Sequence, residues 1–274
     1  MTAPIISLDA VGFGYDPAQP VLRDLSFSVQ RGEVVAIVGR NGAGKSTMLR
    51  LLNGLLRPDT GTVTVSGNAA APLRISQIAR HVGTVFQAPE QQMFNATVRA
   101  EIAFGPAQSG LSPEVQAARI DEAVSRTGLG AVLDMHPLDL DAAMRRFVAV
   151  ASVIACQPDL LLFDEAQRGL DAARRAMLGR IIAVEKAAQR AIVLVCHDMD
   201  FVARHADRVL GLAGGRLAAD APVRDFFADA GATRAVSVEQ PGIVDLAQRL
   251  GLPVALSAPE LIQTLVPRLK KGVG

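Results

Sequence analysis

A glycine-rich loop that ends in a lysine and a serine is the stretch of this sequence best suited to chemistry. Its nine residues are Gly39, Arg40, Asn41, Gly42, Ala43, Gly44, Lys45, Ser46 and Thr47. They fit the pattern of Gly, four residues and then Gly-Lys-Ser, in which backbone N–H groups surround phosphate oxygens. In such a loop Lys45 reaches the β- and γ-phosphates, and the Ser46 hydroxyl binds Mg²⁺. The alternative is a glycine-rich turn that binds no ligand.

The sequence on either side of the loop favours the phosphate-binding interpretation. Residues 34–38 form a short apolar run, which is typical of a buried parallel strand. After the loop, Met48, Leu51, Leu52 and Leu55 recur at helical spacing. A helix that begins near Gly44 directs the positive end of its dipole at the loop, where an anion would bind.

Two further apolar runs end in residues that can assist phosphate chemistry. The run of residues 160–163 is followed by Asp164 and Glu165, and the run of residues 191–196 by His197. The carboxyl ends of parallel strands border the crevice where such folds bind ligands. We therefore expect Asp164 to hold Mg²⁺ opposite Ser46, and Glu165 to orient or deprotonate a water.

The order of the expected elements indicates an α/β fold with a parallel sheet covered on both faces. Residues 4–32 and 62–66 read as an antiparallel β subdomain, and residues 90–146 as a helical insertion. In the insertion, Ser112-Pro113 predicts a helix start and Gly128 its end. We expect a main domain of residues 1–230, a linker near residues 231–237, and an appendage of residues 231–274 with two helical segments.

Composition narrows the class of protein further. The chain has 274 residues, of which half are hydrophobic, and a net charge of +1. This balance provides no basic footprint for nucleic acid. Neither a signal peptide nor an apolar run long enough to span a bilayer is expected, so we predict a cytoplasmic protein that docks on a membrane partner.

The chain resembles the nucleotide-binding subunits of ABC transporters over about residues 4–228. Motifs of that family occur in the family's order at Tyr15, residues 39–47, Gln87, residues 160–165, residues 169–171 and His197. The resemblance implies a P-loop NTPase fold and an ATPase activity that uses ATP and Mg²⁺.

The resemblance also implies a role for each matching residue. Tyr15, the only tyrosine, would stack on the adenine; the alternative is a half-buried ring at a turn. Gln87 would touch Mg²⁺, which Ser46 and Asp164 hold, and would sense the membrane partner. Glu165 would be the catalytic glutamate, and His197 would contact the γ-phosphate.

A narrower resemblance is to the energy-coupling factor (ECF) branch of the family. It rests on residues 86–94 (Phe-Gln-Ala-Pro-Glu-Gln-Gln-Met-Phe), 101–106 and 249–253. It implies a second ATPase subunit, a transmembrane coupling protein and a separate substrate-capturing membrane protein. The cargo of that branch is a vitamin or a cobalt or nickel ion, and its ATPase lies on the inner face of the membrane.

The family's signature motif is altered in this chain. Where Leu-Ser-Gly-Gly-Gln is expected, the sequence reads Leu140-Asp141-Ala142-Ala143-Met144. In the family this motif closes on ATP held by the other subunit. Like charges about 4 Å apart repel by about 4 kcal/mol at an effective dielectric of about 20, so Asp141 would oppose that contact. Ala143 would add a Cβ where glycine allowed close approach, while Asp141 remains a good N-cap.

These observations favour an ATP-hydrolysing subunit of an ECF-type importer, paired with a second ATPase whose signature is intact rather than with its own copy. One alternative is a regulatory subunit that binds ATP without hydrolysing it, which the altered signature favours and Glu165 and His197 oppose. Another is a soluble ABC protein of translation or DNA repair. Such proteins usually carry two ATPase domains or a long coiled-coil insertion, and neither is present.

Overall fold

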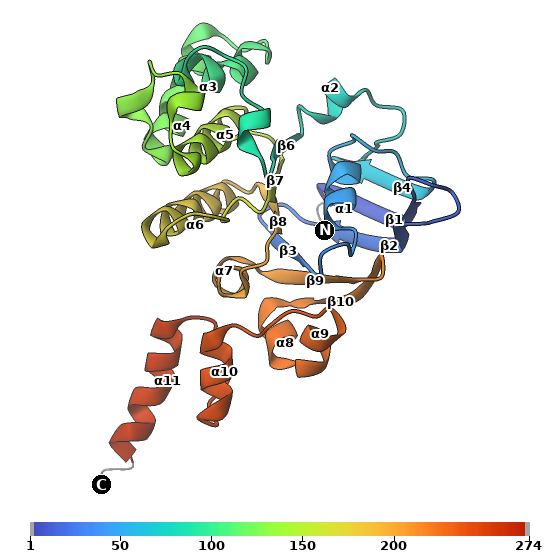
Figure 1. Cartoon of the computed structure of the whole chain (residues 1–274), viewed down its shortest axis with the longest axis vertical. Helices are drawn as coiled ribbons and strands as arrows, with labels where there is room; N and C mark the ends of the chain where they lie inside the picture. Colours follow the sequence, from blue (N-terminus) through green and yellow to red (C-terminus); the bar gives the residue numbers. More distant parts are fainter. Residues whose placement is uncertain (1–2, 272–274) are drawn as a thin grey trace.

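A six-stranded sheet forms the centre of the computed structural model, which describes residues 3–271 (Figure 1). Its strand order is β10-β9-β3-β8-β7-β6. The strands are β3 (Val34–Val38), β6 (Val82–Val85), β7 (Leu160–Asp164), β8 (Ala191–Val195), β9 (Arg208–Ala213) and β10 (Arg216–Pro222). The first five are parallel and β10 pairs antiparallel with β9. The predicted parallel sheet is therefore confirmed.

A four-stranded antiparallel sheet packs on one face of the parallel sheet. Its order is β2-β1-β4-β5, built from β1 (Ile6–Phe13), β2 (Leu22–Val29), β4 (Thr60–Val65) and β5 (Asn68–Ala69). Val35 and Ile37 of β3 join its core, together with the apolar side of α1 (Lys45–Leu52). Val34, Ala36 and Val38 point to the opposite core. Every residue of β3 is buried, which explains its unbroken apolar sequence.

Helices cover the other face and the end of the parallel sheet. They include α6 (Ala172–Ala187), α7 (Met199–His205), α8 (Val223–Ala228) and α9 (Ala230–Ala235). The predicted linker at residues 231–237 is wrong, because most of it lies in α9. Val236 is buried against the sheet: a Cβ on Gly211 would lie 2.6 Å from its Cγ1.

The helical insertion forms a separate lobe, drawn in green in Figure 1. Its main helices are α3 (Val98–Ala107), α4 (Pro113–Thr127) and α5 (Ala142–Ala155), accompanied by short helical turns at Pro89–Gln91, Gly130–Val132 and Pro137–Asp139. A further short helix, α2 (Ile75–Ile78), precedes β6. Ser112 caps α4, and Gly128 ends it with a φ of 69°, so both predicted boundaries are confirmed.

The chain ends in two helices that extend away from the sheets (Figure 1). These are α10 (Gly242–Arg249) and α11 (Ala258–Lys271), which match the two predicted helical segments. A small apolar cluster of Ala247, Leu252, Ala255 and Leu261 joins them. This local core gives the appendage its own packing.

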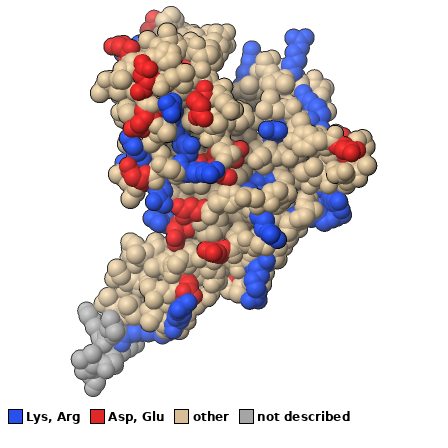
Figure 2. Space-filling view, in the orientation of Figure 1, with Lys and Arg blue, Asp and Glu red and all other residues tan. Residues whose placement is uncertain are grey.

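Basic and acidic side chains are interspersed over the face shown in Figure 2. Many charged side chains of the described residues form ion pairs, including Arg208 with Asp220 and Arg224 with Glu260. Over residues 3–271, none of the helices combines the length and the apolar character needed to cross a membrane.

Glu185 ties the helical insertion to the body of the protein. This carboxylate of α6 is fully buried and contacts Arg126 of α4 and Arg190, which precedes β8. Two guanidinium groups therefore compensate one buried negative charge. Such a group stabilises a fold only while its partners are present.

Replacing Glu185 with alanine should destabilise the protein by about 3 kcal/mol, because two partly buried arginines would lose their counter-charge. The free energy of unfolding in urea measures this effect. Exposed Glu122, which pairs with the same Arg126, provides the control, and Glu122→Ala should cost less than about 1 kcal/mol. Equal losses for the two variants would contradict the role assigned to Glu185.

Candidate functional site

The glycine-rich loop encloses its own lysine. Lys45 Nζ donates hydrogen bonds to the carbonyl oxygens of Gly39 and Arg40, at 2.7 and 2.9 Å. Gly39 has a φ of +145°, and a Cβ there would lie 2.3 Å from the Leu212 carbonyl oxygen. Burial lowers the pKa of Lys45, while the charges of Glu165 and Asp164 oppose that shift. The ammonium group is thus held at the mouth of the loop beside two carboxylates.

A cavity of about 410 Å³ joins this loop to the ends of three strands. It is lined by Val21, Asn41, Gly42, Gly44, Lys45, Ser46, Thr47, Gln87, Glu165, Arg168, Val195 and His197. The predicted residues Gln87, Glu165 and His197 therefore meet the loop in one place. Gly39 and Arg40 support the site through their carbonyl groups, and Ala43 is buried behind it.

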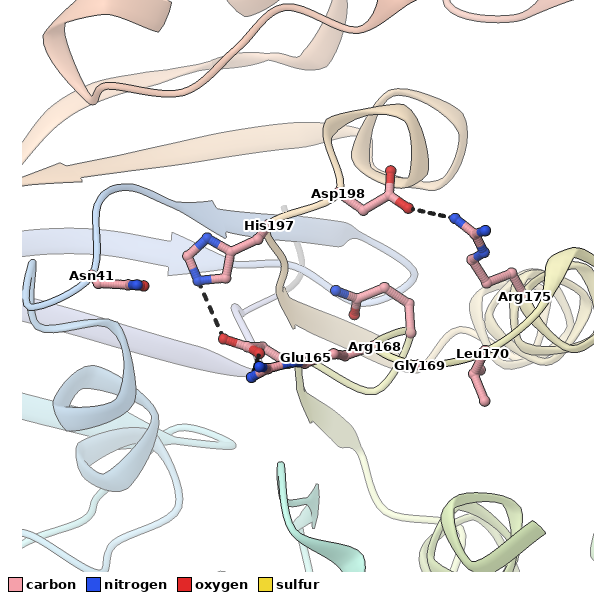
Figure 3. A pocket seen from close by; sticks show the side chains of 9 residues that line it. Asn41, Glu165, Arg168, Gly169, Leu170, Arg175, His197 and Asp198 are labelled. Atoms are coloured by element: carbon pink, nitrogen blue, oxygen red, sulfur yellow. Dashed lines mark hydrogen bonds and ion pairs between the residues drawn. The ribbon is translucent and has the colours of Figure 1, made fainter. Parts of the chain in front are cut away.

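The Glu165 carboxylate is the centre of a polar cluster in this cavity. His197 Nε2 lies 3.2 Å from Oε1, and Gln87 Nε2 and an Arg168 guanidinium nitrogen each lie 3.2 Å from Oε2. Figure 3 shows Glu165 between His197 and Arg168. The backbone of Glu165 has a φ of 51°, an uncommon conformation for a residue other than glycine. Its N–H donates to the Val195 carbonyl at 3.0 Å, which fixes the glutamate to the end of β8.

Ser46 and Asp164 fit a magnesium ion. Both line a second cavity beside the first, together with Gln87. Burial raises the pKa of Asp164, and the charge of Glu165 raises it further. Asp164 and Glu165 supply carboxylates, Ser46 a hydroxyl and Gln87 an amide oxygen. Oxygen atoms of these groups are the ligands that Mg²⁺ prefers.

Comparison with known proteins identifies the family. The ABC transporter family profile matches residues 22–168. The chain belongs to the ATP-binding proteins of ABC transporters. An energy-coupling factor transporter ATP-binding protein, EcfA2 of Lacticaseibacillus paracasei, is 37% identical to this ATPase over 97% of the chain and 98% of its own length. The resemblance to the ECF branch is therefore confirmed.

Other relatives agree with this assignment. A putative ABC transporter ATP-binding protein of Streptomyces avermitilis is 38% identical over 88% of the ATPase and 91% of its own length. The structure of cbiO1 from Clostridium perfringens, described as part of an ABC transporter complex cbiONQ, superposes with a TM-score of 0.77 at 28% identity. It covers 90% of this chain and 100% of that one. The expected ATPase activity and P-loop fold are thus both confirmed.

Tyr15 lies beside the phosphate loop of the ATPase, outside the cavity lining. Its hydroxyl accepts a hydrogen bond from Arg50 at 3.2 Å and lies 3.5 Å from Thr47 Oγ1. The ring meets Phe13 edge-on and is 59% exposed, so it is not the half-buried ring of the alternative interpretation. An exposed ring at this position can stack on a base, and that role remains a prediction.

Arg146 is a positioning residue that sequence analysis missed. From α5 its guanidinium donates to the backbone carbonyls of Gln87 at 3.3 Å, Glu165 at 3.1 Å, Ala166 at 3.4 Å and Arg168. Burial lowers its pKa, and the charge of Glu90 opposes this. One side chain therefore holds the segments that carry Gln87 and Glu165. The doubled arginine at residues 145–146 was the available signal, but the sequence does not reveal which carbonyls it reaches.

The altered signature differs from the expectation in two respects. Asp141 caps α5 through the Met144 N–H at 2.7 Å, as predicted, but its second oxygen pairs with Arg174 of α6 at 2.9 Å. The N–H of Met144 and the charge of Arg174 lower the pKa of Asp141. The predicted steric role of Ala143 is wrong, because its methyl group is buried in the core. Ala142 is the exposed alanine.

Replacing Arg146 with alanine should lower kcat by about tenfold to a hundredfold while KM for ATP changes little, because small displacements of Glu165 impair water activation more than binding. Stability should fall by about 1–3 kcal/mol as carbonyl groups lose their donor. Steady-state kinetics and urea unfolding measure the two effects. Arg146→Lys keeps the positive charge but lacks the planar guanidinium with its several donors. Its kcat and stability should therefore lie between those of the wild type and Arg146→Ala. A fall in kcat no larger than the unfolded fraction would contradict this role.

Proposed function

We propose that this chain hydrolyses ATP to energise an ECF-type importer of a vitamin or a transition-metal ion, as one of two ATPase subunits at the inner face of the membrane. The main support is the cavity in which Lys45, Ser46, Glu165 and His197 lie together. A subunit that only bound ATP would need the loop but not the glutamate and histidine. Their contact at 3.2 Å therefore favours hydrolysis over the regulatory alternative.

Each residue of the cavity has a separate proposed role in phosphoryl transfer. The loop N–H groups of residues 39–47 and the dipole of α1 bind the phosphates, and Lys45 neutralises their charge. Glu165 orients and deprotonates the attacking water, and His197 donates to the γ-phosphate. Ser46, Asp164 and Gln87 would hold Mg²⁺, which supplies further neutralisation of the phosphate oxygens. Catalysis of this kind depends mainly on positioning and charge.

An exposed aromatic pair on the helical insertion suits the membrane partner. The rings of Phe94 and Phe104 meet edge-on with their centroids 4.8 Å apart, and both side chains are exposed. The buried Glu101 carboxylate accepts hydrogen bonds from the N–H groups of Phe94 and Asn95, at 3.1 and 2.9 Å. This holds Phe94 outward, a few residues after Gln87. We infer that the transmembrane coupling protein docks on this pair, in keeping with the cbiONQ complex described for the Clostridium perfringens neighbour.

Replacing Phe94 with aspartate should release the subunit from membranes, because it puts a charge in the apolar contact. Binding of ATP should remain within about twofold of the wild type, since Phe94 does not line the cavity. Co-sedimentation with native membranes measures docking. Val184→Asp alters another exposed apolar residue, in α6, and should leave docking unchanged. Release by both variants or by neither would contradict this surface.

The signature residues favour a pair of different ATPase subunits. A homodimer would place the Asp141–Arg174 pair and the Ala142 methyl group at both nucleotides. Arg174 offsets much of the charge of Asp141, so the expected repulsion is weaker than for a bare carboxylate. The serine hydroxyl is nevertheless lost, and Ala142 adds a Cβ on the exposed side. We therefore infer a partner with an intact signature, which completes the site built on Lys45 and Glu165.

In the native transporter, Glu165→Gln should stop transport almost completely, whereas the matching change in the partner should be milder. Transport assays with each variant measure this asymmetry. In the isolated chain, Asp141→Ser combined with Ala142→Gly should raise the ATPase rate several-fold. Ala143→Gly alone should not, because that methyl group is buried. A wild-type chain that hydrolyses ATP alone as fast as the restored variant would contradict the asymmetry.

Affinity purification of this chain from native membranes is the direct test of the proposed function. We expect a second ATPase, a transmembrane coupling protein and a small substrate-binding membrane protein to copurify. An ATPase rate that vanishes on Glu165→Gln would support catalysis. Copurification with an unchanged rate would favour the regulatory alternative.

A further inference from the structure

Arg168 is a cation in the phosphate cavity that the family motifs discussed above do not include. It lines the cavity together with Lys45, Ser46 and His197. Its guanidinium lies 3.2 Å from Glu165 Oε2. Figure 3 marks this ion pair with a dashed line. The side chain is 67% exposed, so the guanidinium reaches into the cavity without being packed there.

The backbone that carries Arg168 is fixed although its side chain is not. The Arg168 N–H donates to the Glu165 carbonyl at 3.0 Å, and the Leu170 N–H to the Gln167 carbonyl at 3.3 Å. Arg146 of α5 donates a hydrogen bond to the Arg168 carbonyl. Gly169, with a φ of +74°, then leads the chain away toward α6. These two tight turns of residues 165–170 bring Arg168 back beside Glu165.

The charged side chains of the cavity indicate which phosphate Arg168 would contact. Among its described lining residues, the lysine and arginine side chains are Lys45 and Arg168, and the carboxylate is Glu165. A terminal phosphate that approaches Glu165 and His197 meets a like charge on the carboxylate. A diphosphate, which ends one group earlier, brings no phosphate to that position. The position beside Glu165 is therefore where a second cation would distinguish ATP from ADP.

We propose that Arg168 exchanges its ion pair with Glu165 for the terminal phosphate of ATP, and thereby makes the site prefer a nucleoside triphosphate over a diphosphate. This proposal rests on the proposed function, since it requires that ATP binds in the cavity. A guanidinium fork pairs well with phosphate oxygens, and phosphate carries more charge than a carboxylate. The exchange also removes one donor from Oε2 of Glu165, where three contacts now occupy the carboxylate. That oxygen then becomes available to a water.

Calorimetric titration of the full chain with Mg²⁺ and either ADP or the imido analogue of ATP tests this inference. Arg168→Ala should weaken binding of the triphosphate analogue at least tenfold and that of ADP by less than twofold. Arg168→Lys keeps a positive charge without the guanidinium geometry, so its affinity for the triphosphate analogue should lie between those of the wild type and Arg168→Ala. Arg249→Ala removes a similarly exposed arginine that pairs with Asp245 in the appendage, and should change neither affinity.

The outcomes separate this inference from the proposed function. Lys45→Ala should abolish tight binding of both nucleotides, and a wild-type chain that binds neither would overturn the proposed function itself. If the wild type binds both nucleotides but Arg168→Ala weakens them equally, or weakens neither, the preference does not depend on Arg168 and the inference fails alone. If Arg168→Ala hydrolysed ATP faster than the wild type while its affinities for both nucleotides stayed unchanged, the inference would also fail, because Arg168 would then only restrain Glu165.

Discussion

The parallel register of β3, β8 and β7 is the constraint on which the whole site depends. Asp164 lies opposite Val195, and Val195 lies opposite Ile37. The residues that follow these three positions, among them Glu165 and His197, consequently emerge at one edge of the sheet beside the phosphate loop. Because side chains alternate between faces, a slip of one residue would turn buried side chains such as Val193 to the other core. The apolar packing on both faces of the sheet thus also fixes the positions of the residues proposed to act in hydrolysis.

The parts of this structure that follow local rules were predictable from the sequence. The phosphate loop, the apolar strands around it and the capped ends of α4 each depend on neighbouring residues. Parallel pairing then brings Gln87, Glu165 and His197 to the loop without further information. The ABC family and its ECF branch were recognised for the same reason, because their motifs are short and local.

The arginine contacts were not predictable, because they join residues far apart in sequence. Arg146 reaches Gln87, 59 residues earlier, and Arg174 reaches Asp141, 33 residues earlier. No periodicity indicates which carbonyl or carboxylate an arginine will meet. The predicted linker at residues 231–237 failed for a related reason. That segment forms most of helix α9, and Val236 after it is buried beside Gly211, a contact that the local sequence does not reveal.

Helix α5 connects the altered signature to Glu165, the proposed catalytic glutamate. Its N-cap Asp141 is exposed, and Arg146, five residues later, donates to the backbone carbonyl of Glu165. At 1.5 Å per residue these points are only about 7–8 Å apart along one rigid element. Aspartate caps a helix as well as serine does, so the replacement preserves the start of α5 and hence the position of Arg146. In the proposed pair of ATPase subunits, the signature can therefore lose its contact with the partner's nucleotide while the same helix continues to hold the backbone of Glu165.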